Sequence, residues 1–306
     1  MDTEPLFSII VPTYNRGDII GSTLDSILAQ TYDDYEVIIV DDGSTDNTAE
    51  VIRAIDDKRF KYFFQENQER GRARNHGIEK SLGRYITFLD SDDLIYPEHL
   101  EIARQNIQNG SDFFWQPYEE IDRNGHLVRA YERSKKGIVE ELVDKGNILA
   151  CHGIFIKKDL LRDIRFNENR EMAGSEDLDL WLRLTARHPI TNTHQVTNAL
   201  VHHDDRSVFN FPFDRLERRK LLMLESLQSD AVFMEQFGDR FHRVESNAYG
   251  YIALHASMNP SNPLGQALRY LHKSVASSPP VLVQKRTWVT LRNIVSRFMG
   301  AERSST

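Results

Sequence analysis

Acidic side chains concentrate in two short segments, and their spacing suits a divalent cation held beside a phosphorylated ligand. Residues 89–93 read Leu-Asp-Ser-Asp-Asp and residues 40–44 read Val-Asp-Asp-Gly-Ser, each directly after an apolar run. Mg²⁺ and Mn²⁺ prefer carboxylate and phosphate oxygens, and Mg²⁺ usually completes its shell with substrate phosphates. Like charges packed together repel, so such a cluster needs a cation or a hydrogen-bonding ligand. An Asp-x-Asp pair alone also fits an ordinary acidic turn, so its place in the fold has to decide.

Three other features suit a nucleotide, and each also has a simpler explanation. Asp42 can accept hydrogen bonds from a base N–H or a ribose hydroxyl, while the following residues 43–46 fit a turn and a helix cap. Tyr14 can offer a flat face to a nucleobase, or be an ordinary loop tyrosine. Residues 71–77 read Gly-Arg-Ala-Arg-Asn-His-Gly. Arginine beside glycine at a helix start suits a diphosphate, but the same segment fits a solvated basic helix face.

The elements that must position these residues alternate between short apolar runs and amphipathic segments. Strands are expected at residues 7–11, 36–40, 60–64, 85–89 and 112–116, and helices at 18–30, from 45 or 46, at 72–82 and from Pro97. Strands separated by helices of this length predict an α/β fold with a mainly parallel sheet covered on both faces. Ligands bind beyond the carboxyl ends of such strands. The two acidic segments are therefore expected on the same rim.

These segments, in this order, resemble glycosyltransferase family 2, whose members are inverting enzymes of GT-A fold. The resemblance rests on residues 8–15, 40–44, 73–77 and 89–93 and covers roughly residues 6–210. It implies a Rossmann-like, mainly parallel sheet flanked by helices, with a C-terminal helical extension.

The resemblance also implies roles for individual residues, which bind the nucleotide, the metal or the acceptor. The nucleotide is expected to contact Pro12, Tyr14, Asp42, Arg74, Asp90 and Ser91. Within that set, Pro12, Tyr14 and Asp42 would meet the base and Asp90 the ribose. Asp92 would bind the Mn²⁺ or Mg²⁺ ion that bridges the two phosphates.

A second acidic motif, at residues 174–181, supplies the expected catalytic base. Its sequence, Gly-Ser-Glu-Asp-Leu-Asp-Leu-Trp, matches the family's Glu-Asp motif, which points to Asp177. Judged from the residues alone, Asp177 lies near the start of an amphipathic helix, where the helix dipole stabilises carboxylates anyway. Base and helix cap both stay open. Beyond the motif, family members often carry a histidine that reaches the metal or the diphosphate. His203 is preferred over its neighbour His202 for that role, and a surface histidine pair is the alternative.

The expected reaction is a single displacement with inversion, from a nucleoside-diphosphate sugar (UDP-sugar by default) to an acceptor hydroxyl. The acceptor would be a glycan or a lipid-linked glycan in surface polysaccharide assembly. A sugar-1-phosphate nucleotidyltransferase is one alternative, but it usually has a Gly-rich loop where this chain has residues 12–16. A non-catalytic protein that binds nucleotide sugars is another.

Composition narrows the class of protein. The chain has 306 residues, 40% of them hydrophobic, and a net charge of -8, which argues against nucleic acid as a partner. Its single cysteine, Cys151, suits a reducing compartment. The acidic N-terminus does not resemble a signal peptide, and no apolar run reaches the roughly 20 residues that span a bilayer. The expected location is the cytoplasm, with possible attachment to the inner face of the membrane.

Two parts are expected along the chain: a GT-A catalytic domain at 1–212, with a nucleotide-binding half at about 1–115 and an acceptor half at about 116–212, and a mainly helical segment at 213–306.

In residues 285–299, Trp288, Leu291, Val295 and Phe298 or Met299 recur at helical spacing among the basic residues Lys285, Arg286, Arg292 and Arg297. Such a helix can lie in a membrane surface. The alternative is that the same apolar stripe packs on the catalytic domain.

Overall fold

The computed structural model describes residues 4–133, 136–203, 212–259 and 261–303. Two compact units divide the chain. The first comprises Met1–Ile138 and Leu149–Arg206, and the second comprises Val139–Ile148 and Ser207–Thr306. The chain therefore passes into the second unit once, at residues 139–148, before it enters that unit for good.

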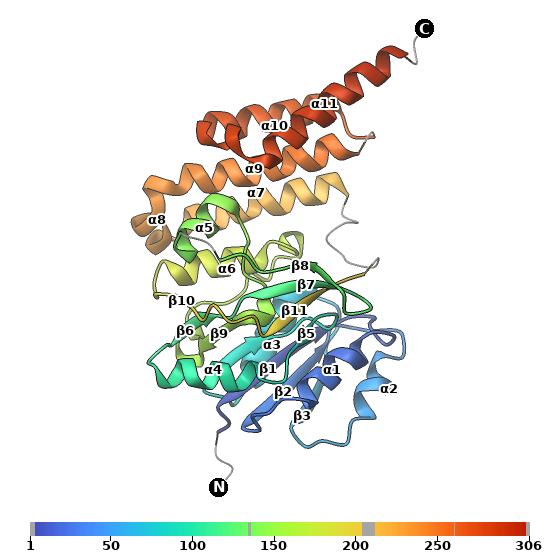
Figure 1. Ribbon diagram of the computed structural model, residues 1–306, viewed down its shortest axis with the longest axis vertical. Helices are drawn as coiled ribbons and strands as arrows, with labels where there is room; N and C mark the ends of the chain where they lie inside the picture. Colours follow the sequence, from blue (N-terminus) through green and yellow to red (C-terminus); the bar gives the residue numbers. More distant parts are fainter. Residues whose placement is uncertain (1–3, 134–135, 204–211, 260, 304–306) are drawn as a thin grey trace. The chain divides into compact units, whose positions relative to one another are not determined.

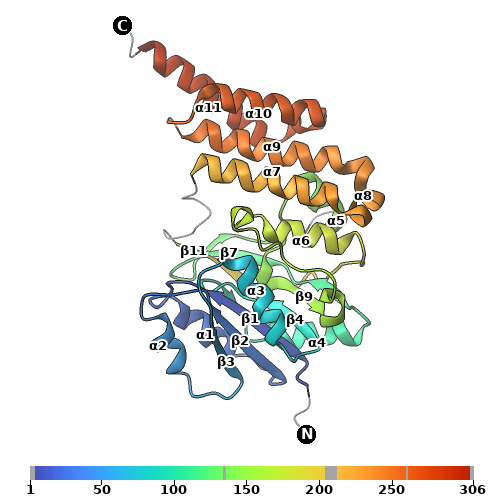
Figure 2. The same ribbon diagram turned by 180° about the vertical axis from the view of Figure 1, so that it is seen from behind.

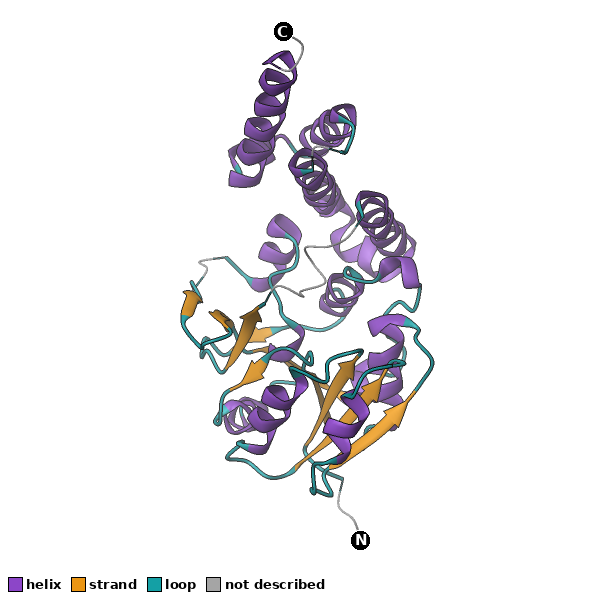
Figure 3. Cartoon of the chain, turned by 90° about the vertical axis from the view of Figure 1, so that its right-hand side faces the viewer, coloured by secondary structure: helices purple, strands orange, loops and turns teal. Residues whose placement is uncertain are grey.

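A seven-stranded sheet organises the described part of the first unit (Figures 1 and 3). Its strands, in spatial order, are β10 (Thr191–Asn192), β6 (Phe113–Trp115), β9 (Ile154–Lys157), β4 (Tyr85–Phe88), β1 (Phe7–Thr13), β2 (Tyr35–Asp41) and β3 (Phe60–Phe64). Only β9 runs against its neighbours. The expectation of a mainly parallel α/β sheet is confirmed, and β2, β1 and β4 lie side by side, so their carboxyl ends share one rim.

Helices cover both faces of this sheet. The helices of this unit are α1 (Ile20–Leu28), α2 (Thr48–Arg53), α3 (Glu69–Lys80), α4 (His99–Gln108) and α6 (Glu176–Thr185). Side chains of α1 and α4, such as Leu24 and Leu100, share one buried cluster with Ile9 and Val11 of β1. On the opposite face α3 packs so tightly that a Cβ added to its Gly77 would lie 2.3 Å from Ile10 Cγ2. Figures 1 and 2 show these helices on opposite sides of the sheet.

Pro12 lies inside β1, so the strand extends past the end expected at Val11. The carbonyl of Ile10 faces β4, where it accepts a hydrogen bond from Leu89 N at 2.9 Å. Pro12, two residues further, faces the same side, but the pairing with β4 has already ended at Ile10. Its missing N–H therefore removes no ladder hydrogen bond, and a proline is tolerated in a central strand.

The same unit contains a second, four-stranded sheet, whose strands in spatial order are β5 (Leu94–Ile95), β11 (Asn198–His202), β7 (Tyr118–Asp122) and β8 (Leu127–Arg129). β5 and β11 are antiparallel, with Asn198 opposite Ile95 and Ala199 opposite Leu94. Continued in the same register, this pairing brings the residues after β11 beside those before β5. It thereby carries residues 201–203 toward the acidic turn at 90–93.

The second unit is helical in its described residues, as expected for residues 213 onward. Its helices are α5 (Ile138–Lys145), α7 (Phe213–Ser229), α8 (Ala231–Phe237), α9 (Phe241–Met258), α10 (Leu264–Ser277) and α11 (Lys285–Arg303). α9 is central and packs against α7, α10 and α11. Val143 of α5 joins this unit, because its carbonyl accepts a hydrogen bond from Asn247 Nδ2 at 2.6 Å. Among the described helices, none is long and apolar enough to cross a bilayer.

Candidate active site

Asp92 and His203 come together at the rim of the main sheet. The β5–β11 register places them close to one another, and His203 Nε2 lies 3.0 Å from Asp92 Oδ2. His202 points elsewhere, with its Nε2 2.7 Å from Glu120 Oε2 on β7. His202 is the last residue of β11 and His203 follows it, and the two side chains contact different acids. The geometry favours His203 for the predicted metal role.

Asp92 sits in an electrostatic environment that a cation would relieve. Burial raises the pKa of Asp92 above its ordinary value, and the negative charges of Asp93 and Asp90 raise it further, while Arg16 and His203 oppose the shift. The Arg16 guanidinium lies 3.6 Å from the Asp92 carboxylate. Arg16 was not singled out from the sequence, although it directly follows the Pro-Thr-Tyr-Asn segment.

Asp93 anchors the acidic turn to three neighbouring segments of the chain. Its buried carboxylate accepts a hydrogen bond from Val201 N at 3.0 Å, and His152 Nδ1 lies 3.0 Å from its other oxygen. Its backbone carbonyl accepts from the Thr23 hydroxyl at 2.9 Å. Asp93 therefore ties the acidic turn to the strand that ends beside His203, and the neighbouring Ser91 is also buried.

Arg74 is a buried bridge between two acidic segments. Its side chain is 2% exposed, with Nη1 2.8 Å from Glu176 Oε1 and Nη2 2.6 Å from Asp90 Oδ1. Burial would raise the pKa of Asp90, but Arg74 and Arg70 outweigh it and lower this pKa to about 2. Asp90 is therefore ionised at neutral pH. Direct contact of Arg74 with a diphosphate stays a prediction, whereas its bridge between Asp90 and Glu176 is already formed.

The two acids of the Glu-Asp motif have different environments. Glu176 is buried and paired with Arg74, and Arg70 Nε lies 3.9 Å from the same Glu176 oxygen. Asp177, at the start of α6, is only partly buried, and its Oδ1 accepts a hydrogen bond from Leu178 N at 2.7 Å. A base needs access to the acceptor, which makes Asp177 the better candidate of the two. Its assignment as the base stays a prediction.

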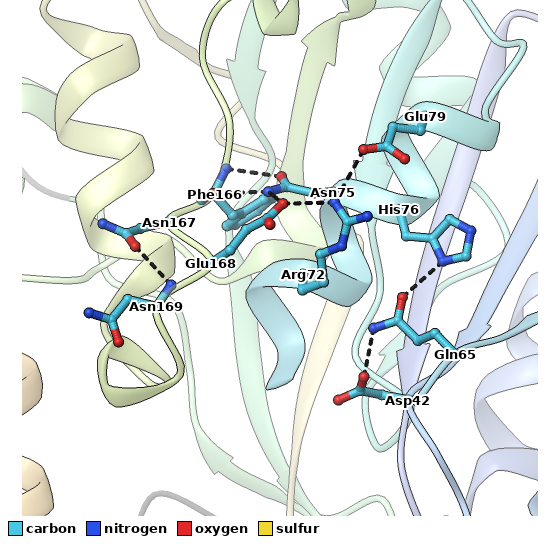
Figure 4. A network of polar contacts seen from close by, with 10 residues as sticks. All are labelled: Asp42, Gln65, Arg72, Asn75, His76, Glu79, Phe166, Asn167, Glu168 and Asn169. Atoms are coloured by element: carbon cyan, nitrogen blue, oxygen red, sulfur yellow. Dashed lines mark hydrogen bonds and ion pairs between the residues drawn. The ribbon is translucent and has the colours of Figure 1, made fainter. Parts of the chain in front are cut away.

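Asp42 lies at the end of β2, inside a chain of polar contacts (Figure 4). It accepts hydrogen bonds from Gln65 Nε2 at 2.7 Å and Gln68 N at 2.9 Å, and Gln65 Oε1 in turn lies 2.8 Å from His76 Nδ1. Burial is the largest influence on Asp42 and raises its pKa, although these hydrogen bonds act against the shift. The neighbouring Asp41 has a structural role, because Tyr62 OH and Ser44 N bond to its carboxylate.

Asn75, on the same helix as Arg74 and His76, holds the segment that leads to α6 (Figure 4). Its Nδ2 donates to Phe166 O at 2.9 Å and to Glu168 Oε1 at 2.8 Å, and its Oδ1 accepts from Phe166 N at 3.0 Å. The Arg-Asn-His segment of α3 thus contacts three parts of the site through three successive side chains. The sequence marked this segment but not these partners, which lie as many as 102 residues away.

The loop after β1 is fixed by a strained residue. Asn15 adopts a positive φ of 49°, and its side-chain oxygen accepts from Thr45 N at 2.8 Å. Asparagine is one of the few residues that tolerates this conformation. Tyr14, just before it, is exposed at the rim, while Pro12 is buried in the strand. The structure therefore leaves the Tyr14 ring accessible to a flat ligand.

A divalent cation fits this rim on grounds of charge. Within residues 4–133, 136–203, 212–259 and 261–303, no three His, Cys, Asp or Glu side chains are grouped so as to hold a metal by themselves. Mg²⁺ commonly takes only one or two protein carboxylates and completes its shell with substrate phosphates and water. Asp92 with His203 beside it matches that pattern, and the negative charges of Asp90 and Asp93 add to the attraction.

The fold matches that of solved glycosyltransferases. Residues 1–349 of Staphylococcus aureus TarS align with a TM-score of 0.65 at 20% identity, covering 98% of this chain and 90% of that one. The mannosyltransferase PcManGT of Pyrobaculum calidifontis, solved with GDP-Man and Mn²⁺, aligns with a TM-score of 0.58 at 17% identity, covering 97% and 87% of the two chains. At these identities the likeness shows the fold, which is GT-A.

Sequence comparison then defines the family. Residues 8–165 match the family described as glycosyl transferase family 2. An uncharacterised glycosyltransferase of Rickettsia typhi is 32% identical over 234 residues, which cover 72% of this chain and 70% of that protein. The putative teichuronic acid biosynthesis glycosyltransferase TuaG of Bacillus subtilis is 31% identical over 185 residues, covering 59% and 72%. The chain belongs to glycosyl transferase family 2, a family of transferase enzymes.

Two relatives are much longer than this chain. The matches to the uncharacterised glycosyltransferases of Rickettsia bellii and Rickettsia felis span 30% and 31% of those proteins. The GalNAc(5)-diNAcBac-PP-undecaprenol beta-1,3-glucosyltransferase of Campylobacter jejuni is 34% identical over 190 residues, which cover 59% of this chain and 60% of that protein.

Proposed function

We propose that this chain is an inverting glycosyltransferase that moves a sugar from a nucleoside-diphosphate donor to an acceptor hydroxyl with the help of Mn²⁺ or Mg²⁺. The observation that carries the proposal is the convergence of Asp92 and His203, 3.0 Å apart, at the rim where Asp90 is bridged by Arg74 to the helix of Asp177. This arrangement supports the proposal, because it links the groups assigned to the donor with the one assigned to the acceptor, as a transfer between two substrates requires.

On the donor side, different residues are assigned to the base, the ribose and the cation. Tyr14 would stack on the base, and Asp42 would accept a hydrogen bond from it once its present contact with Gln65 is exchanged. Asp90, whose side chain is 31% exposed, keeps one oxygen on Arg74 and can accept from a ribose hydroxyl with the other. Asp92 and His203 would hold the cation. That cation, when bound, would offset the charge that develops on the leaving nucleoside diphosphate.

On the acceptor side, Asp177 is the proposed general base. It would accept the proton of the acceptor hydroxyl as that oxygen attacks the anomeric carbon, while the bond from that carbon to the diphosphate breaks. Base and leaving group lie on opposite faces of the sugar, so configuration inverts. Because Arg74 contacts both Glu176 and Asp90, it would hold the helix of Asp177 at a fixed position relative to Asp90. This contact would position the base relative to the donor.

The relatives suggest which substrates to test first. TarS has been solved in complex with UDP-GlcNAc, which supports a UDP-sugar as the default donor. The names of TuaG and of the Campylobacter enzyme refer to teichuronic acid biosynthesis and to an undecaprenol-linked glycan. We therefore infer a role in surface polysaccharide or glycan assembly, with a glycan or lipid-linked acceptor.

The test is an assay of the full chain with a panel of nucleotide sugars, in Mn²⁺, in Mg²⁺ and in excess chelator. Slow release of nucleoside diphosphate from one donor, dependent on the metal, is the expected result. Release of pyrophosphate from a sugar 1-phosphate and a nucleoside triphosphate would instead identify a nucleotidyltransferase. Donor binding in a thermal-shift measurement without turnover on any acceptor would favour a non-catalytic binding protein.

A further inference from the structure

The C-terminal helix α11 packs through one face and exposes another. Thr287, Thr290 and Ile294 are buried, whereas Trp288 and Val295, at a spacing that keeps both on one helix face, are exposed. Trp288 is 64% exposed, although the chain's other two tryptophans are buried. The apolar stripe noted in the sequence is thus largely an outward-facing surface, and the helix is held in its unit by a different set of residues.

Other exposed apolar side chains adjoin this face. Met299 lies on it one turn beyond Val295, and Phe298 flanks it. In the short turn directly before α11, Leu282 is exposed and Val283 is 85% exposed. Soluble proteins rarely leave so many large apolar side chains together on one element without a function.

The sequence around the same surface contains basic residues but almost no acidic ones. Of the 46 acidic residues, all but Glu302 lie at or before Glu245, and the stretch between these two contains six Lys or Arg residues. Lys285 and Arg292 are exposed, and their spacing from Trp288 places them beside it on the outward face. This basic stretch belongs to a chain whose net charge is -8.

Two other basic residues of α11, Arg286 and Arg297, are used inside the helical unit. Arg286 Nη1 donates to Asn247 O at 3.2 Å, and Arg297 Nη1 donates to Ala256 O at 3.0 Å. Arg286 and Arg297 therefore fix the helix to the unit, while Lys285 and Arg292 stay at the surface.

We propose that this surface, formed by Leu282, Val283, Lys285, Trp288, Arg292, Val295, Phe298 and Met299, binds the face of an anionic lipid bilayer. The apolar side chains would enter the boundary between headgroups and acyl chains, with Trp288 at the interface, and the basic side chains would contact lipid phosphates. A second copy of the chain is a poorer occupant. A two-fold interface pairs a surface with itself, which would bring the basic side chains of both copies together without acidic partners.

The test measures binding of the full chain to vesicles of phosphatidylcholine alone and of phosphatidylcholine mixed with phosphatidylglycerol. Sedimentation with the mixed vesicles only, weakened by added salt, is expected. Trp288 provides a second readout. Because Trp115 and Trp181 are buried, a blue shift of tryptophan emission on adding anionic vesicles reports the insertion of Trp288.

Two surface variants separate the apolar and the electrostatic contributions. W288S/V295S and K285E/R292E should each weaken binding to anionic vesicles by roughly tenfold or more. Because the buried face of α11 is untouched, neither should lower the melting temperature. L127S/V128S, which alters two exposed apolar residues of β8, is the matched control and should bind like the wild type.

Three results would overturn the proposal: no binding of the wild type to anionic vesicles, binding that both surface variants retain in full, or a wild-type dimer that W288S/V295S converts to a monomer without any vesicle binding. The last would assign the surface to self-association. None of these measurements uses donor turnover, so the membrane proposal can fail while the proposed transferase function stands.

Discussion

At the scale of single residues, Asp92 is the proposed point of contact between the chain and a cation. Its carboxylate lies among like charges from Asp90 and Asp93, which oppose its ionisation. We expect Asp92→Asn to abolish metal-dependent turnover without loss of fold, because the amide removes the charge that would bind the metal and also relieves the repulsion. Turnover in a titration of Mn²⁺, with circular dichroism as the check on folding, measures both effects.

The matched control is Asp239→Asn, which removes a carboxylate whose side chain is 76% exposed. It should leave turnover and the dependence on Mn²⁺ unchanged. An Asp92→Asn enzyme with near-native activity and the same Mn²⁺ dependence would contradict the metal assignment.

Asp177 and Glu176 are adjacent but should behave in opposite ways. We expect Asp177→Asn to lower turnover by about 10²–10⁴-fold, the usual contribution of a general base, while donor affinity stays nearly unchanged. Glu176→Gln should instead lower the melting temperature, because it leaves the buried Arg74 without one of its two carboxylate partners. Donor titrations and thermal unfolding of both variants provide the comparison. Loss of donor binding in Asp177→Asn would move that residue to a structural or metal role.

At the scale of elements, the sequence predicted most strands of the main sheet well, but it missed the short β10 of that sheet and the strands of the second sheet. The third strand was predicted at its observed bounds, Phe60–Phe64, and the fourth within one residue, because both are apolar runs of ordinary length. β5 and β10 each have two residues, which is too short for any periodicity to show. Their positions depend on ladders between distant segments, such as β5 with β11, which local patterns do not encode.

The site shows the same division. Asp92 could be singled out because paired carboxylates at a strand end have recognisable chemistry, whereas Asp177 was singled out through the resemblance to the family's Glu-Asp motif. Their partners could not, since the contact between Arg74 and Glu176 joins positions 102 residues apart and arises only when α3 and α6 are both in place. Arg16 and Arg70 were missed for that reason: an arginine in a loop or at a helix start has no local mark of its eventual partner.

The bridge between α3 and α6 leads to a prediction about two arginines of α3, Arg74 and Arg72. Arg74→Met should lower the free energy of unfolding by about 3–5 kcal/mol, because it leaves Glu176 buried and deprives Asp90 of its partner. Arg72→Met should lower it by only about 0–1 kcal/mol, since the side chain of Arg72 is partly exposed and its partners, Glu168 and Glu79, are more exposed still. Urea unfolding of both variants measures the difference.

The double variant R74M/E176Q distinguishes a bridge from simple packing. It should recover part of the stability lost in Arg74→Met, because a neutral glutamine needs no cation. Equal unfolding free energies for Arg74→Met and Arg72→Met would show that the bridge contributes little and that α6 is held by its apolar face instead.

At the scale of the whole molecule, the chain divides its charge and its core between two units. Most of the acidic residues and the proposed chemistry belong to the first unit, and the acid-free stretch at residues 246–301 belongs to the second. The units are not consecutive in sequence, because residues 139–148 belong with the helices. Leu142 and Val143 of α5 are buried, and Gln284 Nε2 donates to Asp144 O at 3.3 Å within the second unit. Residues 139–148 precede residue 212 in the sequence but pack with the helices that follow it. A single boundary at residue 212 therefore does not separate the two compact units.

This arrangement predicts how the catalytic domain can be isolated. A truncation to residues 1–212 keeps α5 but removes Asn247 and Arg243, which bond to Val143 and Asp144. The exposed apolar face of α5 should then cause aggregation and lower the melting temperature relative to the full chain. A second truncation, in which a Gly/Ser linker also replaces residues 139–148, should be soluble and melt cooperatively, because the first unit then contains only its own elements. Light scattering and thermal unfolding of the two proteins, side by side, provide the measurement. Equal behaviour of the two would show that α5 is stable without the helical unit and that residues 1–212 are a domain in their own right.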